Sequence, residues 1–234
     1  MLRRDRLWGR RKGKKLSARR TGLMETVYRR LALDLDRPAP GELGSLFAAP
    51  VADIHLEIGF GGGERLLAAA RAHPEDGFIG VEPFLNGLAK AVASIADDGD
   101  RNVRLFGGDA ADLLAWLPAR SLVEVGLFYP DPWPKRRHWK RRFVRPENLD
   151  LIARALRPGG RFRFASDVPS YVEWTLMHML PRPDFEWTAG GPDDWRLPFA
   201  DWIETRYEAK ARRAGRISTY LAYRRTEVPA KPLS

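Results

Sequence analysis

The stretch "VADIHLEIGFGGGERL", residues 51 to 66, joins an apolar run to a glycine-rich turn and the start of a helical pattern. Gly59, Gly61 and Gly63 let the backbone turn sharply and let a ligand approach main-chain atoms closely. A dinucleotide-binding turn has the spacing G-x-G-x-x-G, which requires a glycine where this chain has Glu64. The stretch therefore predicts a strand, a tight turn and a helix, and it argues against a nicotinamide dinucleotide site. A purely structural turn is the alternative.

Four further apolar runs follow, with helical patterns between them. They cover residues 77–82, 102–107, 121–129 and 161–167. The clearest helical pattern, 146–157, begins at Pro146 and ends at the sequence "RPGG". Strands that alternate with helices predict an α/β fold with a mainly parallel sheet. In such sheets, ligands bind beyond the carboxyl ends of the strands.

Acidic side chains stand at three of these strand ends. Glu57 closes the first run, Glu82 the second, and Asp109 follows the third. An acid about 20 residues past the glycines can accept hydrogen bonds from ribose hydroxyls, and Asp109 could meet an adenine amino group. Each acid alone could be a solvated side chain or, for Asp109, a helix N-cap. Together they predict a nucleoside site, and a cationic nucleoside such as S-adenosylmethionine suits an acidic surrounding.

The segment "YPDPWPKRRHWKRR", residues 129 to 142, places Asp131 between two prolines and ahead of a basic run. The prolines restrict the backbone that carries this carboxylate. Trp133 is a candidate to stack on a flipped base, or it is a core residue below the loop. The basic run is either a solvated face or a set of phosphate contacts, and its place beside a candidate active site favours phosphate contacts.

Composition limits the classes of function. The chain has 234 residues, 44% of them hydrophobic, so one globular domain with a tail is expected. Its net charge of +10 favours a polyanionic partner. The absence of cysteine excludes a thiolate nucleophile and disulfides, and the four histidines lack metal-ligand spacing, so we assign no metal. Without a long apolar run or a signal-peptide pattern, we expect no membrane span and a cytoplasmic location.

The N-terminal region is strongly basic. Residues 1–20 contain ten Lys and Arg residues against one Asp. We interpret residues 1–50 as a partly flexible arm that orders on RNA, with a linker at 36–50, and residues 51–234 as the catalytic domain. A solvated tail without a fixed partner is the alternative for the arm. Whether the protein is a monomer or a homodimer stays open.

The motifs resemble those of a known family. The glycine loop, "GVEPF" (80–84), Asp109 and "LRPGGRF" (156–162) resemble class I S-adenosylmethionine-dependent methyltransferases. Together with "YPDPWPKRRHWKRR", "FASDV" (164–168) and "TRYEAKARRAG" (205–215), the chain resembles the bacterial tRNA (guanine-N7-)-methyltransferases from about residue 51 to 224. The resemblance implies a Rossmann-like sheet of seven strands, mainly parallel with helices on both faces. Its last strand would be antiparallel, with 217–225 as the candidate.

The resemblance also implies roles for individual residues. Cofactor contacts fall on the glycine loop and the acids: Glu57, Gly59, Gly61, Gly63, Glu82, Asp109 and Asp131. Asp131 is also the implied catalytic residue. Substrate contacts fall on Lys135, Asp167, Thr205, Arg206, Tyr207 and Glu208. Contacts to tRNA fall on Arg137, His138, Trp139, Lys140, Arg141 and Arg142. Without the resemblance, Asp167 could cap a helix beginning near Pro169, and 203–215 would be an amphipathic surface helix.

The implied reaction is methylation of guanine N7 in the tRNA variable loop, at position 46, with S-adenosylmethionine as the methyl donor. N7 carries an in-plane lone pair, so this chemistry requires no cysteine and no strong base. Two alternatives remain. An exocyclic-amine RNA methyltransferase would have a second proline where this chain has Trp133. A non-enzymatic RNA-binding protein would leave the acids at successive strand ends unexplained.

Overall fold

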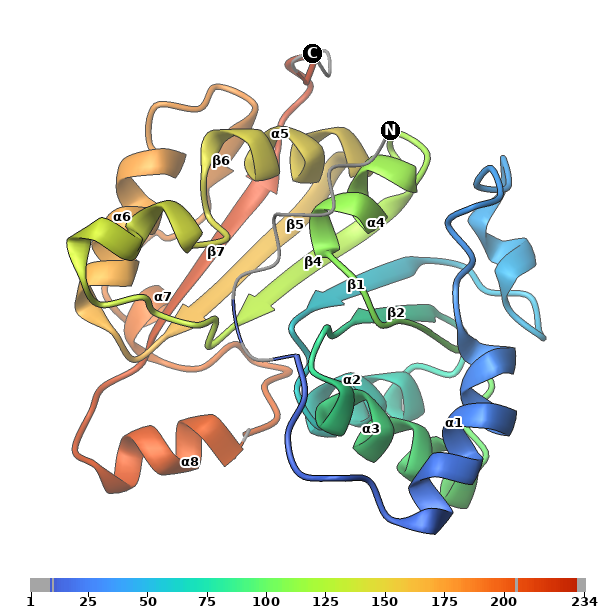
Figure 1. The fold of residues 1–234 in the computed structure, drawn as a ribbon. Helices are drawn as coiled ribbons and strands as arrows, with labels where there is room; N and C mark the ends of the chain where they lie inside the picture. Colours follow the sequence, from blue (N-terminus) through green and yellow to red (C-terminus); the bar gives the residue numbers. More distant parts are fainter. Residues whose placement is uncertain (1–8, 10, 205, 231–234) are drawn as a thin grey trace. The chain divides into compact units, whose positions relative to one another are not determined.

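The computed structural model describes residue 9, residues 11–204 and residues 206–230; the side chains of residues 206 and 207 lie outside this description. Seven strands form a sheet in the order β3-β2-β1-β4-β5-β7-β6 (Figure 1). This confirms the predicted Rossmann-like, mainly parallel sheet. The chain divides into two compact units, residues 1–121 and residues 122–234.

The first unit alternates strands and helices around three parallel strands. Its elements are α1 (Ala18–Leu31), η1 (Leu43–Leu46), β1 (Ile54–Ile58), α2 (Glu64–Ala72), β2 (Gly77–Val81), α3 (Leu85–Asp98), β3 (Val103–Phe106) and α4 (Ala110–Trp116). β1 pairs with β2, and β2 with β3, all parallel. Every residue of β2 is buried, as expected for a strand covered on both faces. The predicted strands at 51–58, 77–82 and 102–107 thus lie within two or three residues of their observed bounds.

The core of the first unit joins α2 and α3 to the strands. Leu66 and Leu67 of α2 pack with Leu88 and Val92 of α3 in one buried cluster, which also holds Leu105 of β3. This spacing of apolar residues produces the helical pattern that follows the glycine turn. The helix therefore begins at the end of the glycine turn, where the sequence predicted it.

Residues 18–47 pack within the first unit, which differs from the expected arm and linker. Helix α1 lies beside α3 (Figure 1), and its Tyr28 packs against the core cluster. Beyond α1, Leu33, Leu43 and Phe47 are buried. The linker expectation rested on Pro and Gly content, which does not reveal that these apolar side chains have a core to enter. The extent of a separate RNA-binding arm stays a prediction.

The second unit carries the remaining four strands. Its elements are β4 (Leu122–Phe128), η2 (Arg136–Arg141), α5 (Pro146–Ala155), β5 (Leu156–Ser166), α6 (Pro169–Met179), β6 (Phe185–Trp187), α7 (Asp193–Arg196), α8 (Arg206–Arg213) and β7 (Thr219–Arg225). β4 and β5 are parallel, and β7 runs antiparallel to both β5 and β6. The predicted antiparallel strand at 217–225 is confirmed. The sequence missed β6, whose three residues are too few for a periodic signal.

Helix α5 begins at Pro146 as predicted but ends at Ala155, two residues early. The "RPGG" sequence is part of β5 rather than a separate loop, and Gly159 takes a left-handed φ of 80°. Glycine accommodates this conformation without strain. The strand therefore starts five residues before the expected 161.

Candidate active site

The glycine loop after β1 is held by a carboxylate. Gly59, Gly61 and Gly63 have left-handed φ values of 72°, 60° and 82°. The amide of Gly61 donates to Oε2 of Glu82 at 2.7 Å, and the amide of Phe84 donates to Oε1 at 2.8 Å. Glu82 is buried, and it ties the turn after β1 to the turn after β2. The glycines are therefore required by the turn itself, and their contact with a cofactor stays a prediction.

Glu57, at the end of β1, is also buried and faces a cation. The Nε of Arg65 on α2 lies 3.4 Å from Oε2 of Glu57, and both side chains are 8% exposed. Nearby opposite charge stabilises a buried carboxylate that would otherwise be costly to hold ionised. Arg65 was not predicted from the sequence, although its position in the first turn of the helix after the glycine loop was a usable signal.

Asp109 takes the structural role that the sequence left open. Its Oδ1 accepts a hydrogen bond from the amide of Ala111 at 2.9 Å, so Asp109 is the N-cap of α4. The side chain is partly exposed after the end of β3. Capping uses one carboxylate oxygen and does not conflict with a ligand contact by the other. The three predicted acids of the first unit thus lie at or just after the ends of three neighbouring parallel strands.

The loop after β4, residues 129–134, has an unusual backbone. Tyr129 and Trp133 take left-handed φ values of 50° and 43°, although neither is glycine and each precedes a proline. Such conformations cost free energy and persist where the surroundings hold them. The amide of Tyr129 donates to the carbonyl of Ala165 at 2.8 Å, and its hydroxyl bonds Ser218 Oγ at 2.8 Å. The strained residues flank Asp131 on both sides.

Asp131 has an exposed side chain in a crowded loop. Desolvation by its surroundings raises the pKa of this carboxyl above its ordinary value. The exposed carboxylate of Asp131 can accept hydrogen bonds from N–H donors that approach from solvent.

The basic loop, residues 135–142, divides into exposed and packed side chains. Lys135, Arg136, Arg137 and Lys140 are exposed, consistent with phosphate contacts. Trp133 is half-buried rather than in the core, with His138 edge-on to its ring and the guanidinium of Arg141 5.0 Å from its centroid. Desolvation and the surrounding cations lower the pKa of His138.

Two members of the basic loop pack inward. Trp139 meets Trp174 edge-on at 5.6 Å. Arg142 is 1% exposed and donates from Nε to the carbonyl of Pro132 at 3.0 Å. A guanidinium that is buried in this way cannot reach a phosphate, so the expected tRNA contact of Arg142 is revised. The charge run in the sequence gave no sign that its last member turns inward.

The other expected substrate residues of the second unit are engaged within the protein. Asp167 pairs with Arg216 Nε at 2.6 Å and does not cap α6, whose N-cap is Val168. Glu208 accepts hydrogen bonds from Trp202 Nε1 and from the hydroxyl of Tyr220. Burial and these neighbours raise the pKa of Tyr220. Substrate contact by Asp167 and Glu208 stays a prediction.

Three further residues were assigned to the substrate by resemblance. Thr205 lies outside the described residues. Arg206 and Tyr207 begin α8, and their side chains are outside the description. Their roles stay predictions.

An aromatic cluster that was not predicted from the sequence packs against the start of the loop after β4. It consists of Phe128, Tyr129, Phe199, Trp202 and Tyr220.

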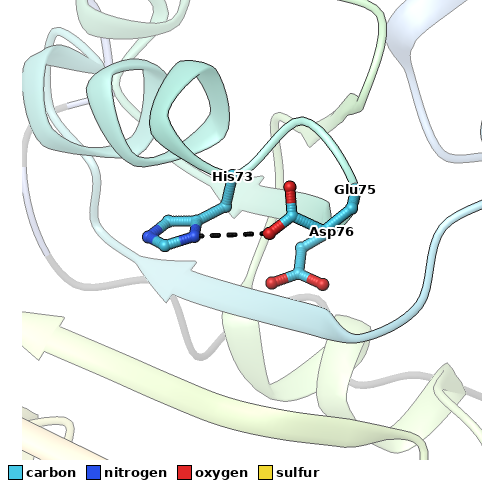
Figure 2. Close-up of side chains that lie close together, drawn as sticks. All are labelled: His73, Glu75 and Asp76. Carbon is cyan, nitrogen blue, oxygen red and sulfur yellow. Dashed lines mark ion pairs between the residues drawn. The ribbon is translucent and has the colours of Figure 1, made fainter.

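A separate cluster at the other end of β2 joins a histidine to two acids. His73, Glu75 and Asp76 offer ligand atoms within 4.8 Å of one another (Figure 2). Asp76 already accepts from the amide of Asp53 at 3.2 Å and contacts His55 Nε2 at 3.2 Å. These contacts give the cluster a structural role at the amino end of the strand, whereas Glu82 follows its carboxyl end.

The sheet order and the helices that alternate with the strands are those of the class I methyltransferase fold. A family model described as "Putative methyltransferase" matches residues 51–221. The 16S rRNA methyltransferase KamB has a TM-score of 0.52 and 18% identity, covering 75% of this chain and 89% of its own. A SAM-dependent O-methyltransferase from Thermotoga maritima has a TM-score of 0.50 and 15% identity, covering 81% and 65%. At these identities the likeness shows the fold.

Sequence comparison identifies one family within the class I methyltransferases. The tRNA (guanine-N(7)-)-methyltransferase of Rhodopseudomonas palustris (strain BisB5) is 57% identical, over 93% of this chain and 85% of the relative. The protein of the same name from Rhizobium meliloti (strain 1021) is 56% identical, over 93% and 94%. The chain belongs to the tRNA (guanine-N(7)-)-methyltransferase family. Among its described residues, every helix is too short or too polar to cross a membrane.

Proposed function

We propose that this protein transfers a methyl group from S-adenosylmethionine to N7 of the variable-loop guanine of tRNA, at position 46. The observation that carries the proposal is an identity of 53–58% over most of the chain to relatives named for this reaction. The site residues are consistent with it: buried carboxylates follow two parallel strands, and Asp131 stands in a rigid loop ahead of a basic run.

The residues of the first unit suit the proposed cofactor. Glu57 and Glu82 are carboxylate acceptors at successive strand ends, which is where ribose hydroxyls and a cationic group would find partners. Left-handed Gly59 and Gly61 leave the backbone of the turn without side chains to obstruct a ligand. The bound cofactor would supply an electrophilic methyl group.

Asp131 would act on the guanine. Its carboxylate can accept hydrogen bonds from the N1 and N2 donors, which adenine does not present in the same arrangement. N7 attacks with its own lone pair, so Asp131 need not remove a proton beforehand. The base becomes cationic as the new bond forms, and a carboxylate nearby stabilises that charge. The rigid backbone around Asp131 lowers the entropic cost of this alignment.

The exposed cations of the basic loop would hold the tRNA. Lys135, Arg136, Arg137 and Lys140 carry four positive charges within six residues. Contacts of this kind release counterions from the RNA and make binding depend on salt. They position the tRNA and carry no base specificity, which leaves recognition of guanine to Asp131.

The first test is site-specific detection of the product. Unmodified tRNA, the protein and methyl-labelled S-adenosylmethionine are incubated, and the tRNA is then treated with borohydride and aniline, which cut at 7-methylguanosine. We expect one cut in the variable loop, no cut in tRNA with adenine at that position, and loss of the cut in Asp131→Ala. Label without a cut would instead support the exocyclic-amine alternative. Tight tRNA binding without any label would support an RNA-binding protein.

A further inference from the structure

Arg142 has an environment unlike that of the other basic-loop residues. Its guanidinium is buried and donates to three oxygens: the carbonyl of Pro132 at 3.0 Å, the carbonyl of Ser170 at 2.7 Å and Ser170 Oγ at 3.1 Å. All three nitrogens of the planar group therefore have an acceptor. A lysine cannot make these three hydrogen bonds in the same plane, because its ammonium is a compact point charge.

Aromatic rings surround the same cation. The guanidinium carbon lies 4.7 Å from the ring centroid of Trp139, 4.8 Å from that of Tyr171 and 5.5 Å from that of Trp174. Cation–π contacts are strongest where water is excluded. Carbonyl oxygens and ring faces together compensate for the burial of the charge.

Helix α6 anchors the segment that carries Arg142. The hydroxyl of Tyr171 accepts from the amide of Phe143 at 2.9 Å, and the indole N–H of Trp174 donates to the carbonyl of Val144. The backbone on the far side of the basic loop is thus fixed to α6. From this anchor, Arg142 reaches back ten residues to Pro132 and closes the loop at its base.

The bond to Pro132 falls where the backbone needs support. Pro132 lies between Asp131 and Trp133, and Trp133 has the left-handed φ of 43°. The prolines at 130, 132 and 134 have no N–H to donate. The turn therefore has fewer donors through which it can be held, and the carbonyl of Pro132 provides an acceptor that Arg142 uses.

We propose that Arg142 is a positioning residue, which holds the carbonyl of Pro132 so that Asp131 and the base of the basic loop keep their active geometry. This inference rests on the proposed function for its effect on catalysis. It separates Arg142 from its exposed neighbours, which contact the tRNA. In enzymes generally, a misplacement of about 1 Å can reduce the rate by up to about 100-fold.

The test uses Arg142→Lys, which keeps the charge, with Lys140→Met as a matched exposed control. We expect Arg142→Lys to lower kcat at saturating tRNA by about 10- to 100-fold. The slope of log Kd for tRNA against log salt should stay at the wild-type value. Lys140→Met should reduce that slope by about 0.7 to 0.9. A wild-type kcat in Arg142→Lys would overturn the proposal.

A charge-preserving lysine could still contact a phosphate, so the neutral variant Arg142→Met completes the series. Its salt slope should also match the wild type, because a buried guanidinium contacts no phosphate. A reduced slope, as in Lys140→Met, would overturn the proposal and restore Arg142 as an RNA contact. Binding of S-adenosylmethionine, measured calorimetrically, checks that each variant is folded.

Limited trypsin digestion gives a readout that needs no activity. Arg142→Lys retains every cleavage site in residues 135–142, so a faster cut there reports an opened loop. We expect this cut to be faster in Arg142→Lys, and an unchanged rate would count against the proposal. If wild-type protein formed no 7-methylguanosine, the proposed function would fail, whereas digestion would still decide whether Arg142 closes the loop.

Discussion

At the scale of single residues, like-charged neighbours have unlike roles. Lys140 is exposed, whereas Arg142 is buried among aromatic rings and carbonyls. The acids differ in the same way: Glu82 holds two backbone amides, Asp109 caps a helix, and Asp131 is exposed in a strained loop. The sequence predicted which acids gather at strand ends. It did not predict the bond from the Gly61 amide to Glu82, because these two residues follow different strands and lie 21 positions apart.

The raised pKa of Asp131 leads to a prediction for Asp131→Asn. Desolvation disfavours the charged form of this group. Above the pKa of Asp131, replacing the ionised carboxylate by a neutral amide should therefore not lower the free energy of unfolding. We expect the variant to melt at or above the wild-type temperature and to lose most of its activity. A calorimetric scan and the cleavage assay measure the two effects.

The raised pKa of Asp131 also predicts how the methyltransferase activity depends on pH. As the pH falls through the raised pKa, the carboxylate is protonated and kcat should decline, beginning above the pH at which an ordinary aspartate titrates. The residual activity of Asp131→Asn should lack this acidic limb. An acidic limb that persists unchanged in Asp131→Asn would show that another group controls it.

At the scale of elements, close backbone approach explains one helical glycine. Gly87 lies in the first turn of α3, and a Cβ built there would be 2.3 Å from the carbonyl oxygen of Gly61. Helix α3 can therefore start directly against the glycine loop only because position 87 has no side chain. The sequence predicted the loop from its own glycines, but Gly87 gave no signal, since its contact lies 26 residues away.

Gly87→Ala should push α3 away from the glycine loop. We expect a loss of about 1–3 kcal/mol in the free energy of unfolding, together with weaker binding of S-adenosylmethionine. Gly22→Ala in α1 is the matched control, because a Cβ there meets nothing within 4 Å. That change should stabilise the protein by about 0.5–1 kcal/mol. Equal effects of the two substitutions on melting and affinity would contradict the packing argument.

At the scale of the whole molecule, the described N-terminal residues are anchored to distant parts of the first unit. The carbonyl of Arg11 accepts from the amide of Leu85, and the amide of Gly13 donates to Asn86. The guanidinium of Arg104 binds the carbonyls of Arg30 and Ala32 at the end of α1. Local composition did not predict this packing, because the anchoring partners lie some 70 residues further along the chain.

Two truncations should distinguish tRNA binding by the first ten residues from stabilisation of the fold by α1. Removal of residues 1–10, which include four arginines, should leave the melting temperature unchanged and reduce the salt dependence of tRNA binding. Removal of residues 1–32 also deletes α1 and exposes the apolar residues of α3, so we expect melting to fall by more than about 5 °C. An unchanged salt slope in the shorter truncation would show that these arginines do not contact tRNA.

The α/β order of elements, the glycine turn, the acids at the strand ends and the family can all be inferred from the amino-acid sequence. Such features are encoded by neighbours along the chain, through hydrophobic periodicity and turn chemistry. The inward position of Arg142 and the burial of Leu33, Leu43 and Phe47 after α1 follow only from the tertiary structure. The physical reason is that burial depends on what packs against a side chain. For Arg142 those groups are on α6, 28 residues away, beyond any local pattern.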